Sequence, residues 1–167
     1  MRALASHHDR LLAYHGWANR RLLASLEGLD EARYRADCGL FFGSIHATLN
    51  HIAVVDRLWF ARVLHLPRPF ERLDAEAAPD RAGLAAVLAE GVGLWRAWLA
   101  GQDDEALLAP LDYSNMAGER FQRPHTELLT HLVNHGTHHR GQVTAAMSTL
   151  GLEVPALDFL YYTPKQP

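Results

Sequence analysis

Histidine is the residue type in this sequence with the clearest capacity for chemistry. The chain has eleven histidines, and five of them fall within residues 125–139. A neutral imidazole is the commonest protein ligand for metals and can also act as a general base near neutral pH. The alternative for any single inward histidine is a hydrogen-bonded core residue. The five clustered residues are His125, His131, His135, His138 and His139.

Two of these histidines share the apolar face of a predicted helix. At about 100° per residue, His139 lies about 40° from His135, and Leu128 and Leu132 lie on the same side. Two imidazoles at positions i and i+4 on one face can share one ion, as in helical zinc motifs. For a pair within so dense a cluster, metal binding is favoured over the core interpretation.

A third ligand is expected from another helix. His131 would lie roughly 12 Å from His139 along an axis that rises ~1.5 Å per residue, which is too far for a triad with His135. His51 lies on the inward face of its helix, whereas His46 projects elsewhere. The prediction is therefore a metal site of His51, His135 and His139.

Three imidazoles leave at least one coordination position for water or substrate, which is typical of a catalytic site rather than a closed structural one. Zinc or nickel suits such a set best, and iron, copper or manganese are alternatives. His131 and His138 are candidate catalytic groups beside the ligands. Gln142 faces the same side and could orient a ligand or substrate. A hydrogen bond from Gln142 to a neighbouring helix is an equal alternative.

Four further residues are interpreted as structural or incidental. Gly136 and Gly141 each cost a helix roughly 1 kcal/mol against alanine, which a close approach by a helix or ligand, or ordinary tight packing, would explain. Arg140 is expected at the surface or in an ion pair between helices. Cys38 has no assigned histidine partner and is interpreted as an incidental thiol.

Helical periodicity predicts the elements that carry these residues. Apolar residues recur at steps of three and four in four runs, Ser44 is the expected N-cap of the second, and glycines follow the first, third and fourth. These runs predict an all-α four-helix bundle, with a short irregular or hairpin insertion at 111–121 before the last helix. The apolar tail 152–167 is expected to pack on the bundle or on a partner subunit. The four runs are 7–27, 45–63, 84–99 and 124–150.

Composition limits the class of protein. The 167 residues predict one domain, 1–167, and the net charge of −3 disfavours binding to nucleic acid or to an anionic membrane. No apolar stretch approaches the roughly 18 residues of a membrane span, and the N-terminus lacks the apolar centre of a signal peptide, so a cytoplasmic location is expected. A single cysteine excludes an internal disulfide and a cysteine-rich metal site.

The histidine stretch 131–142, HLVNHGTHHRGQ, resembles the last-helix signature of the DinB/YfiT-like family of metal-dependent enzymes. Trp17-Ala18-Asn19, the segment 48–52, and Asp158 with Tyr161-Tyr162 agree with that family in order. The resemblance implies a four-helix bundle, a homodimer, and a divalent metal held by three histidines that map onto His51, His135 and His139. Relatives in the wider superfamily include transferases that use bacillithiol or another low-molecular-weight thiol, and a mycothiol-dependent maleylpyruvate isomerase.

Three functions are compatible with such a site. The first is a transferase in which the metal binds a low-molecular-weight thiol as thiolate and presents it to an electrophilic small-molecule substrate. The second is a metal-dependent hydrolase, for which Asp56 and Glu127 do not share the ligand face, so that His131 or His138 would have to act as the base. The third is a non-catalytic metal-binding protein of a stress response.

Overall fold

All four predicted long helices are present. The computed structural model describes residues 2–163, and in it the four helices are α1 (Ala3–Ser25), α3 (Ile45–Val63), α4 (Arg81–Ala100) and α6 (His125–Thr149). Ser44 caps α3 as predicted, because its side chain accepts a hydrogen bond from the backbone N–H of Ala47. The predicted all-α four-helix bundle is therefore confirmed.

Two short helices were not predicted from the sequence. They are α2 (Glu31–Arg35) and α5 (Asp104–Leu108), each of five residues. Asp30 and Asp103 cap them by accepting hydrogen bonds from the backbone N–H groups of Arg33 and Ala106. Five residues are too few for a periodic apolar pattern, so only the capping residues could have indicated them.

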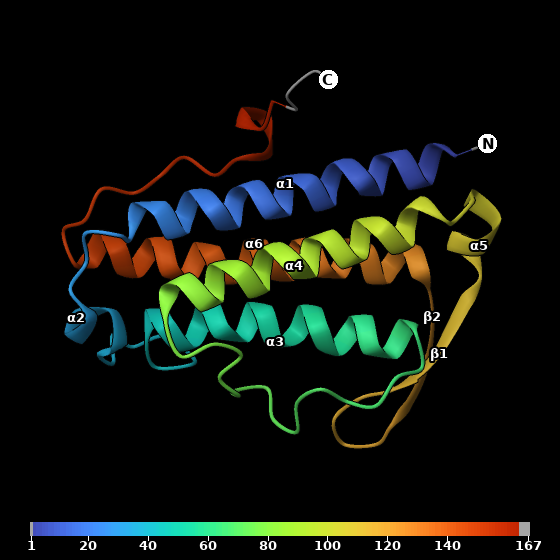
Figure 1. The fold of residues 1–167 in the computed structure, drawn as a ribbon, viewed down its shortest axis with the longest axis horizontal. Coiled ribbons are helices and arrows are strands. Elements are labelled where there is room, and N and C mark those ends of the chain that lie inside the picture. Colours follow the sequence, from blue (N-terminus) through green and yellow to red (C-terminus); the bar gives the residue numbers. More distant parts are fainter. Residues whose placement is uncertain (1, 164–167) are drawn as a thin grey trace.

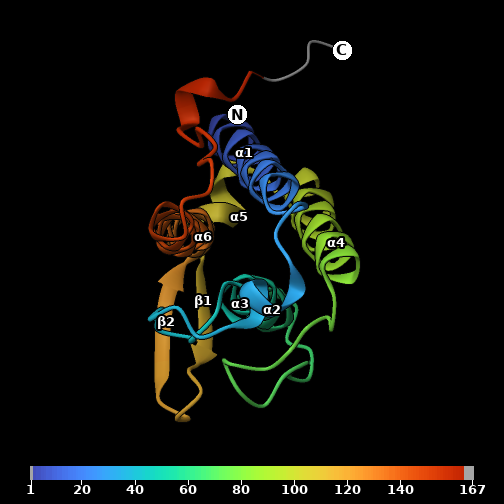
Figure 2. The same cartoon turned by 90° about the vertical axis from the view of Figure 1, so that its left-hand side faces the viewer.

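The long helices occupy four corners of the bundle when it is viewed along its length (Figure 2). α1 packs against α4 and α6, and α3 packs against the same two helices. α3 and α4 run in the same direction, and α1 and α6 run in the opposite one (Figure 1). The segment 64–80 therefore returns along the bundle before α4 begins. In this arrangement α3 and α6, which carry the predicted ligands, are antiparallel neighbours.

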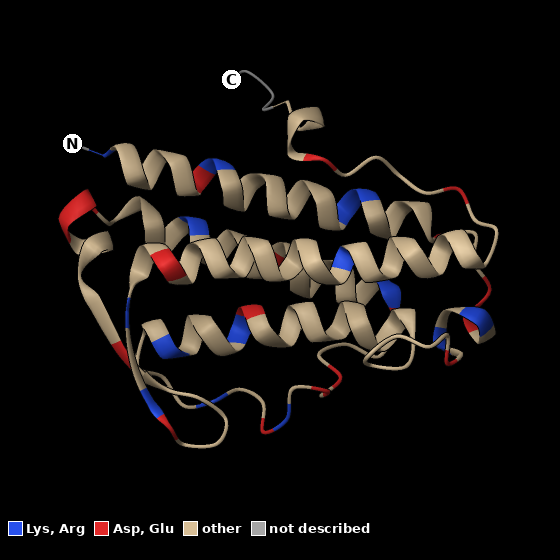
Figure 3. Cartoon of the chain, turned by 180° about the vertical axis from the view of Figure 1, so that it is seen from behind, with Lys and Arg blue, Asp and Glu red and all other residues tan. Residues whose placement is uncertain are grey.

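The expectation that no apolar stretch approaches the length of a membrane span is wrong for α4, which is the described helix that is long and apolar enough, by length and composition alone, to cross a membrane. In the structure this helix is one of the four corners and packs between α1 and α3. Elsewhere on the chain acidic and basic residues are interspersed rather than gathered by sign, as the view from behind shows (Figure 3). This mixing agrees with the small net charge of −3.

The core consists of two apolar clusters with a polar layer between them. One cluster includes Leu22, Ile52 and Val143, and the other includes Leu12 and Leu132. On α1, α3 and α6, buried polar residues occupy the positions between the two clusters. These polar residues are His15, Asn19, Asp56 and Arg140.

The insertion before α6 is an antiparallel hairpin, as predicted. Its strands are β1 (Pro110–Ser114) and β2 (Arg120–Pro124), and Tyr113 lies opposite Phe121. The tail crosses α1, where the hydroxyl of Tyr14 donates to the carbonyl of Leu157 at 2.9 Å. Packing of the tail on the bundle is thus confirmed at Leu157, Phe159 and Tyr162. In the 3₁₀ turn Phe159–Tyr161, by contrast, Leu160 is 91% exposed and Tyr161 is 63% exposed. Residues 164–167 of the predicted tail lie outside the described residues.

Candidate metal centre

The structure brings the three predicted ligands together between α3 and α6. The Nε2 atom of His135 lies 3.1 Å from Nε2 of His51 and 3.1 Å from Nε2 of His139. All three candidate donor atoms lie within 4.8 Å of one another. His51 and His139 are buried and His135 is half-buried. The four-residue spacing on α6 places two rings on one turn, and the packing of α3 against α6 supplies the third.

Hydrogen bonds at the opposite ring nitrogens indicate the tautomer of two ligands. Nδ1 of His51 donates to the backbone carbonyl of Leu73 at 2.7 Å. Nδ1 of His139 donates to the side-chain oxygen of Gln142 at 2.8 Å. Because each acceptor requires a proton on Nδ1, each Nε2 carries a lone pair. This arrangement is the one that metal-binding histidines usually show.

The electrostatics of the cluster keep its histidines neutral. Burial, with further contributions from the neighbouring histidines, lowers the pKa of His135 to about 3. Burial is also the main cause that lowers the pKa of His51 and of His139. At neutral pH the three rings are therefore uncharged and able to donate electron pairs.

A divalent cation fits this donor set. Where the Nε2 atoms of neutral rings face one another at 3.1 Å without a proton between them, their lone pairs repel. A bound cation removes that repulsion, and tetrahedral ligands with metal–nitrogen bonds of about 2.0–2.1 Å are themselves about 3.3 Å apart. Nδ1 of His135, on the opposite side of the ring from the candidate donor atom, is buried and has no hydrogen-bond partner among the described residues. A hydrogen bond at Nδ1 therefore fixes the tautomer of His51 and His139 but not that of His135.

Phe42 forms one wall of the centre. Its ring stacks on His51, with centroids 3.9 Å apart and planes 24° apart, and its edge meets His139 at 5.7 Å. The neighbouring Phe41 is 83% exposed, so of the two rings only Phe42 packs against the cluster. Gly43 has a positive φ of 82°, which lets the chain turn sharply between Phe42 and the N-cap of α3. The sequence reasoning missed Phe42, because it lies in a loop without periodicity.

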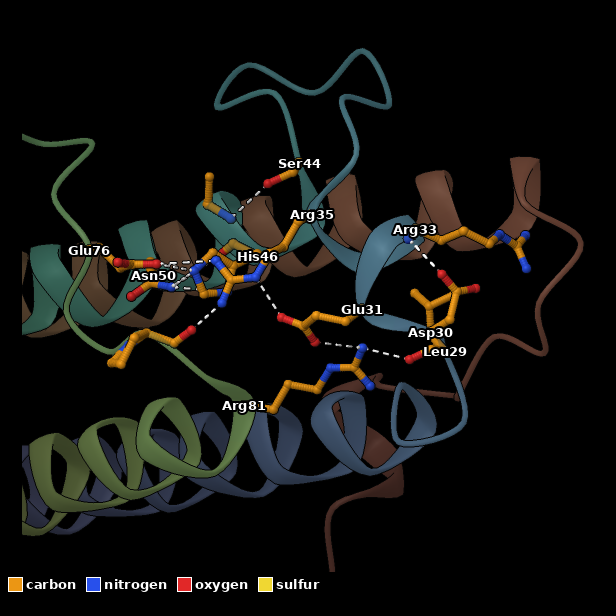
Figure 4. A network of polar contacts seen from close by, with 12 residues as sticks. Leu29, Asp30, Glu31, Arg33, Arg35, Ser44, His46, Asn50, Glu76 and Arg81 are labelled. Atoms are coloured by element: carbon orange, nitrogen blue, oxygen red, sulfur yellow. Dashed lines mark hydrogen bonds and ion pairs between the residues drawn. The ribbon is translucent and has the colours of Figure 1, made fainter.

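A polar network ties the segment 64–80 to α3 near Glu76 (Figure 4). The same segment supplies the Leu73 carbonyl that bonds to His51. Nε2 of His46 lies 2.6 Å from a carboxylate oxygen of Glu76, and the side-chain oxygen of Asn50 accepts from the backbone N–H of Ala78 at 2.9 Å. Arg35 donates to Glu76 and to the carbonyl of Pro79. His46 therefore points away from the three ligands, as predicted, and anchors the segment that contacts one of them.

The three candidate catalytic residues lie beside the cluster. His131 is exposed, and its ring centroid is 5.5 Å from that of His135. His138 is also exposed, and its Nε2 lies 3.2 Å from Nε2 of Gln142. Gln142 thus contacts the ligand His139 through its oxygen and His138 through its nitrogen.

Asp56 and Glu127, which the sequence placed off the ligand face, bond elsewhere. Asp56 is buried, and its Oδ2 lies 3.1 Å from Nε2 of His15. Glu127 is exposed at the start of α6 and pairs with Arg123.

The expectation of a surface position or an ion pair for Arg140 is wrong in both respects, although the residue does bridge helices. Its side chain is buried, 1% exposed, and donates to Nδ1 of His15 at 3.0 Å and to the side-chain oxygen of Asn19 at 2.9 Å. Nε2 of His15 then reaches Asp56. The guanidinium and the carboxylate are linked through a histidine rather than paired directly, because His15 lies between α6 and α3.

Gly136 permits this arrangement. A Cβ atom added there would lie 2.2 Å from Cε1 of His15, so the predicted close approach by another helix is confirmed for Gly136. At Gly141 no atom lies within 4 Å of an added Cβ, so neither a close approach by another helix nor tight packing holds there, and nothing in the structure explains that glycine.

A four-helix bundle with three converging neutral histidines between two antiparallel helices defines a class of candidate metalloprotein. The family model of the DinB family matches residues 4–166, and the chain belongs to that family. The Protein DinB of Bacillus subtilis (strain 168) is 29% identical over 162 residues, covering 92% of this chain and 91% of that protein.

A solved structure, YfiT from Bacillus subtilis, resembles this fold with a TM-score of 0.71 over 87% of this chain and 89% of that one. YfiT is described as a probable metal-dependent hydrolase with an unusual four-helix bundle topology. At 18% sequence identity, this likeness shows the fold.

Proposed function

We propose that this protein is a metal-dependent enzyme that binds one divalent cation through Nε2 of His51, His135 and His139 and transfers a low-molecular-weight thiol to an electrophilic small molecule. The observation that carries this proposal is the convergence of three neutral rings, with Nε2 of His135 at 3.1 Å from Nε2 of both His51 and His139 and all three donor atoms within 4.8 Å of one another. Zinc or nickel suits the donor set best. When bound, the cation would supply Lewis acidity, which lowers the pKa of a thiol or a water molecule.

The protein's own groups have separate tasks in this scheme. The Leu73 carbonyl and the Gln142 oxygen hold two ligand rings in orientation. Phe42 covers the face of His51 and excludes water from that side. Desolvation by the surrounding protein atoms lowers the pKa of His131, so this ring is neutral at pH 7 and can accept a proton beside the cluster.

Thiol transfer is favoured over hydrolysis because the nearby carboxylates are engaged elsewhere. Asp56 bonds to His15, Glu76 to His46, and Asp74 to Arg72. A hydrolase of this kind commonly uses a carboxylate as general base. A thiol has an ordinary pKa of about 8.5, which a bound cation would lower further, so its proton would leave to solvent water at neutral pH without such a base. Hydrolysis remains the second candidate, since the solved relative YfiT is described as a probable metal-dependent hydrolase. In that case His131 or His138 would act as the base.

Elemental analysis of the untagged protein tests the metal site. We expect about one divalent ion per chain, and its loss in each of His51→Ala, His135→Ala and His139→Ala. His138→Ala is the matched control, because this exposed histidine lies next to a ligand but outside the cluster. A protein that neither contains a metal nor takes one up on titration would disprove the proposal.

The reaction is tested with the metal-loaded protein. We expect conjugation of a model electrophile by at least one thiol of a panel, and its loss in His51→Ala. Hydrolysis of ester or amide substrates without any thiol, abolished by His131→Ala or His138→Ala, would instead support the hydrolase. A large fall in melting temperature on chelation with no turnover in either assay would assign the third function, non-catalytic metal binding.

The homodimer implied by the family resemblance and the cytoplasmic location expected from the sequence stay predictions. Sedimentation equilibrium of the metal-loaded protein would test the first.

A further inference from the structure

A cavity of about 610 Å³ lies between the C-terminal end of α3 and the hairpin. It is of a size that suits a small organic ligand. Its walls combine cations and aromatic rings from three segments, α3, the start of the segment 64–80, and both strands of the hairpin. The lining residues used below are Arg62, Asp112, Tyr113, Arg120 and Phe121.

Arg62 is a half-buried cation without a counter-ion. Its guanidinium carbon lies 4.5 Å from the centroid of Trp59 and 5.9 Å from that of Tyr113. Neither Arg62 nor Arg120 makes an ion pair with a carboxylate anywhere in residues 2–163. The lining acid, Asp112, is exposed and accepts a hydrogen bond from Gln122. The cavity therefore offers an unpaired guanidinium that an anion would stabilise.

Two stacked aromatic rings line the cavity beside this cation. Tyr113 and Phe121 lie opposite each other in the hairpin register, and their rings stack with centroids 5.6 Å apart and planes 22° apart. Phe121 is 38% exposed and Tyr113 is half-buried, so each leaves ring surface uncovered. Flat apolar surface next to one guanidinium fits a planar group that carries a carboxylate.

A row of ring contacts joins this cavity to the metal centre. Tyr113 meets Trp59 at 4.9 Å between centroids, and Trp59 meets His131 at 5.5 Å. His131 in turn lies 5.5 Å from His135, one of the three ligands. The cavity and the centre are thus two ends of one aromatic-lined strip along α3 and α6.

We propose that the hairpin cavity binds the carboxylate end of an aromatic acid, with Arg62 pairing to the carboxylate and Tyr113 and Phe121 contacting the ring. The role of this acid as the enzyme's substrate rests on the proposed function, but its binding does not. Arg62 is then a specificity-determining residue that places the other end of the molecule toward His131 and the metal centre.

Calorimetric titration with 2-naphthoate tests the site on the full chain, both metal-loaded and after chelation. The neutral isostere 2-naphthamide should bind at least tenfold more weakly. Arg62→Met should weaken naphthoate binding at least tenfold and leave naphthamide binding nearly unchanged. Arg57→Met is the matched control, because Arg57 lies on the same helix but pairs with Glu90 outside the cavity. It should bind naphthoate as the unaltered protein does.

Arg62 packs on Trp59, so Arg62→Met could lose binding because the local fold is disturbed. A second variant, at a residue that is not packed in this way, separates the two effects. Arg120→Ala changes an exposed strand residue and should weaken naphthoate binding by a smaller factor, about threefold. Equal affinity for acid and amide, or unchanged affinity in Arg62→Met, would overturn the proposal. Loss of naphthoate binding on chelation would also overturn it, because the carboxylate would then bind the metal. Naphthoate binding in a protein that takes up no metal would support the cavity and disprove only the proposed function.

Discussion

Gln142 shows how a single hydrogen bond can control the chemistry of a ligand. Its oxygen accepts the Nδ1 proton of His139 and so keeps the lone pair on Nε2. We expect Gln142→Leu to weaken metal binding by about tenfold or more, because loss of such a partner typically costs 10- to 100-fold in affinity. Gln142→Glu retains an acceptor oxygen and should bind at least as tightly as the unaltered protein. Competition with a chromophoric chelator measures both constants, and equal affinity in the leucine variant would contradict this role.

The residues of the candidate metal centre also show what helical periodicity can and cannot predict about a site. The 3.6-residue repeat places His135 and His139 on one face and His51 on an inward face, so the three candidate ligands could be predicted to converge. The Leu73 carbonyl and Phe42 could not, because they come from irregular segments whose path depends on long-range contacts. The helical repeat predicts the direction in which a side chain points, but not the group that it will contact.

Arg140 illustrates the same limit from the opposite side of α6. The helical repeat places Arg140 about 140° from His135, which predicts a surface position or an ion pair between helices. In the structure its charge is held by His15, Asn19 and Thr137 in the layer between the two apolar clusters. The sequence did contain one signal of this layer, since glycine at 136 costs helix stability and needs a structural reason.

The close contact between α1 and α6 depends on Gly136. Gly136→Ala would place a methyl group 2.2 Å from Cε1 and 2.6 Å from Nδ1 of His15. We expect a loss of about 2 kcal/mol or more in the free energy of unfolding, because overpacking of roughly 1–3 kcal/mol adds to a disturbed polar network. Gly141→Ala on the same helix meets open space and should stabilise the protein by up to about 1 kcal/mol. Urea denaturation compares the two, and a neutral Gly136→Ala would show that α1 moves freely.

Element order and direction were only partly predictable. Four runs of helical periodicity were enough for four helices and the Ser44 cap. The parallel course of α3 and α4 was not predicted, because local patterns do not specify how helices are connected. The connection 64–80 did carry a signal, since antiparallel neighbours are usually joined by roughly two to eight residues. A longer connection allows the chain to return along the bundle, and here it also delivers the Leu73 carbonyl to the site.

For the whole molecule, buried neutral histidines should make the metal-free protein sensitive to acid. Burial is the main cause that lowers the pKa of His8, His51, His131, His135 and His139 in the fold. Below a pH of about 6.5 the unfolded chain binds protons that the folded chain does not, so the free energy of unfolding falls as the pH falls. For His135 this loss continues down to a pH of about 3.

Each such histidine steepens the pH dependence by at most about 1.4 kcal/mol per pH unit. Urea denaturation in the presence of a chelator should therefore show a marked loss of stability between pH 7 and pH 5. His135→Asn removes one of these groups and should make the slope shallower by up to that amount. If the free energy of unfolding fell equally steeply with pH in the two proteins, His135 would be able to take up a proton while the protein stays folded. The ring would then be less enclosed in solution than its position between α3 and α6 implies.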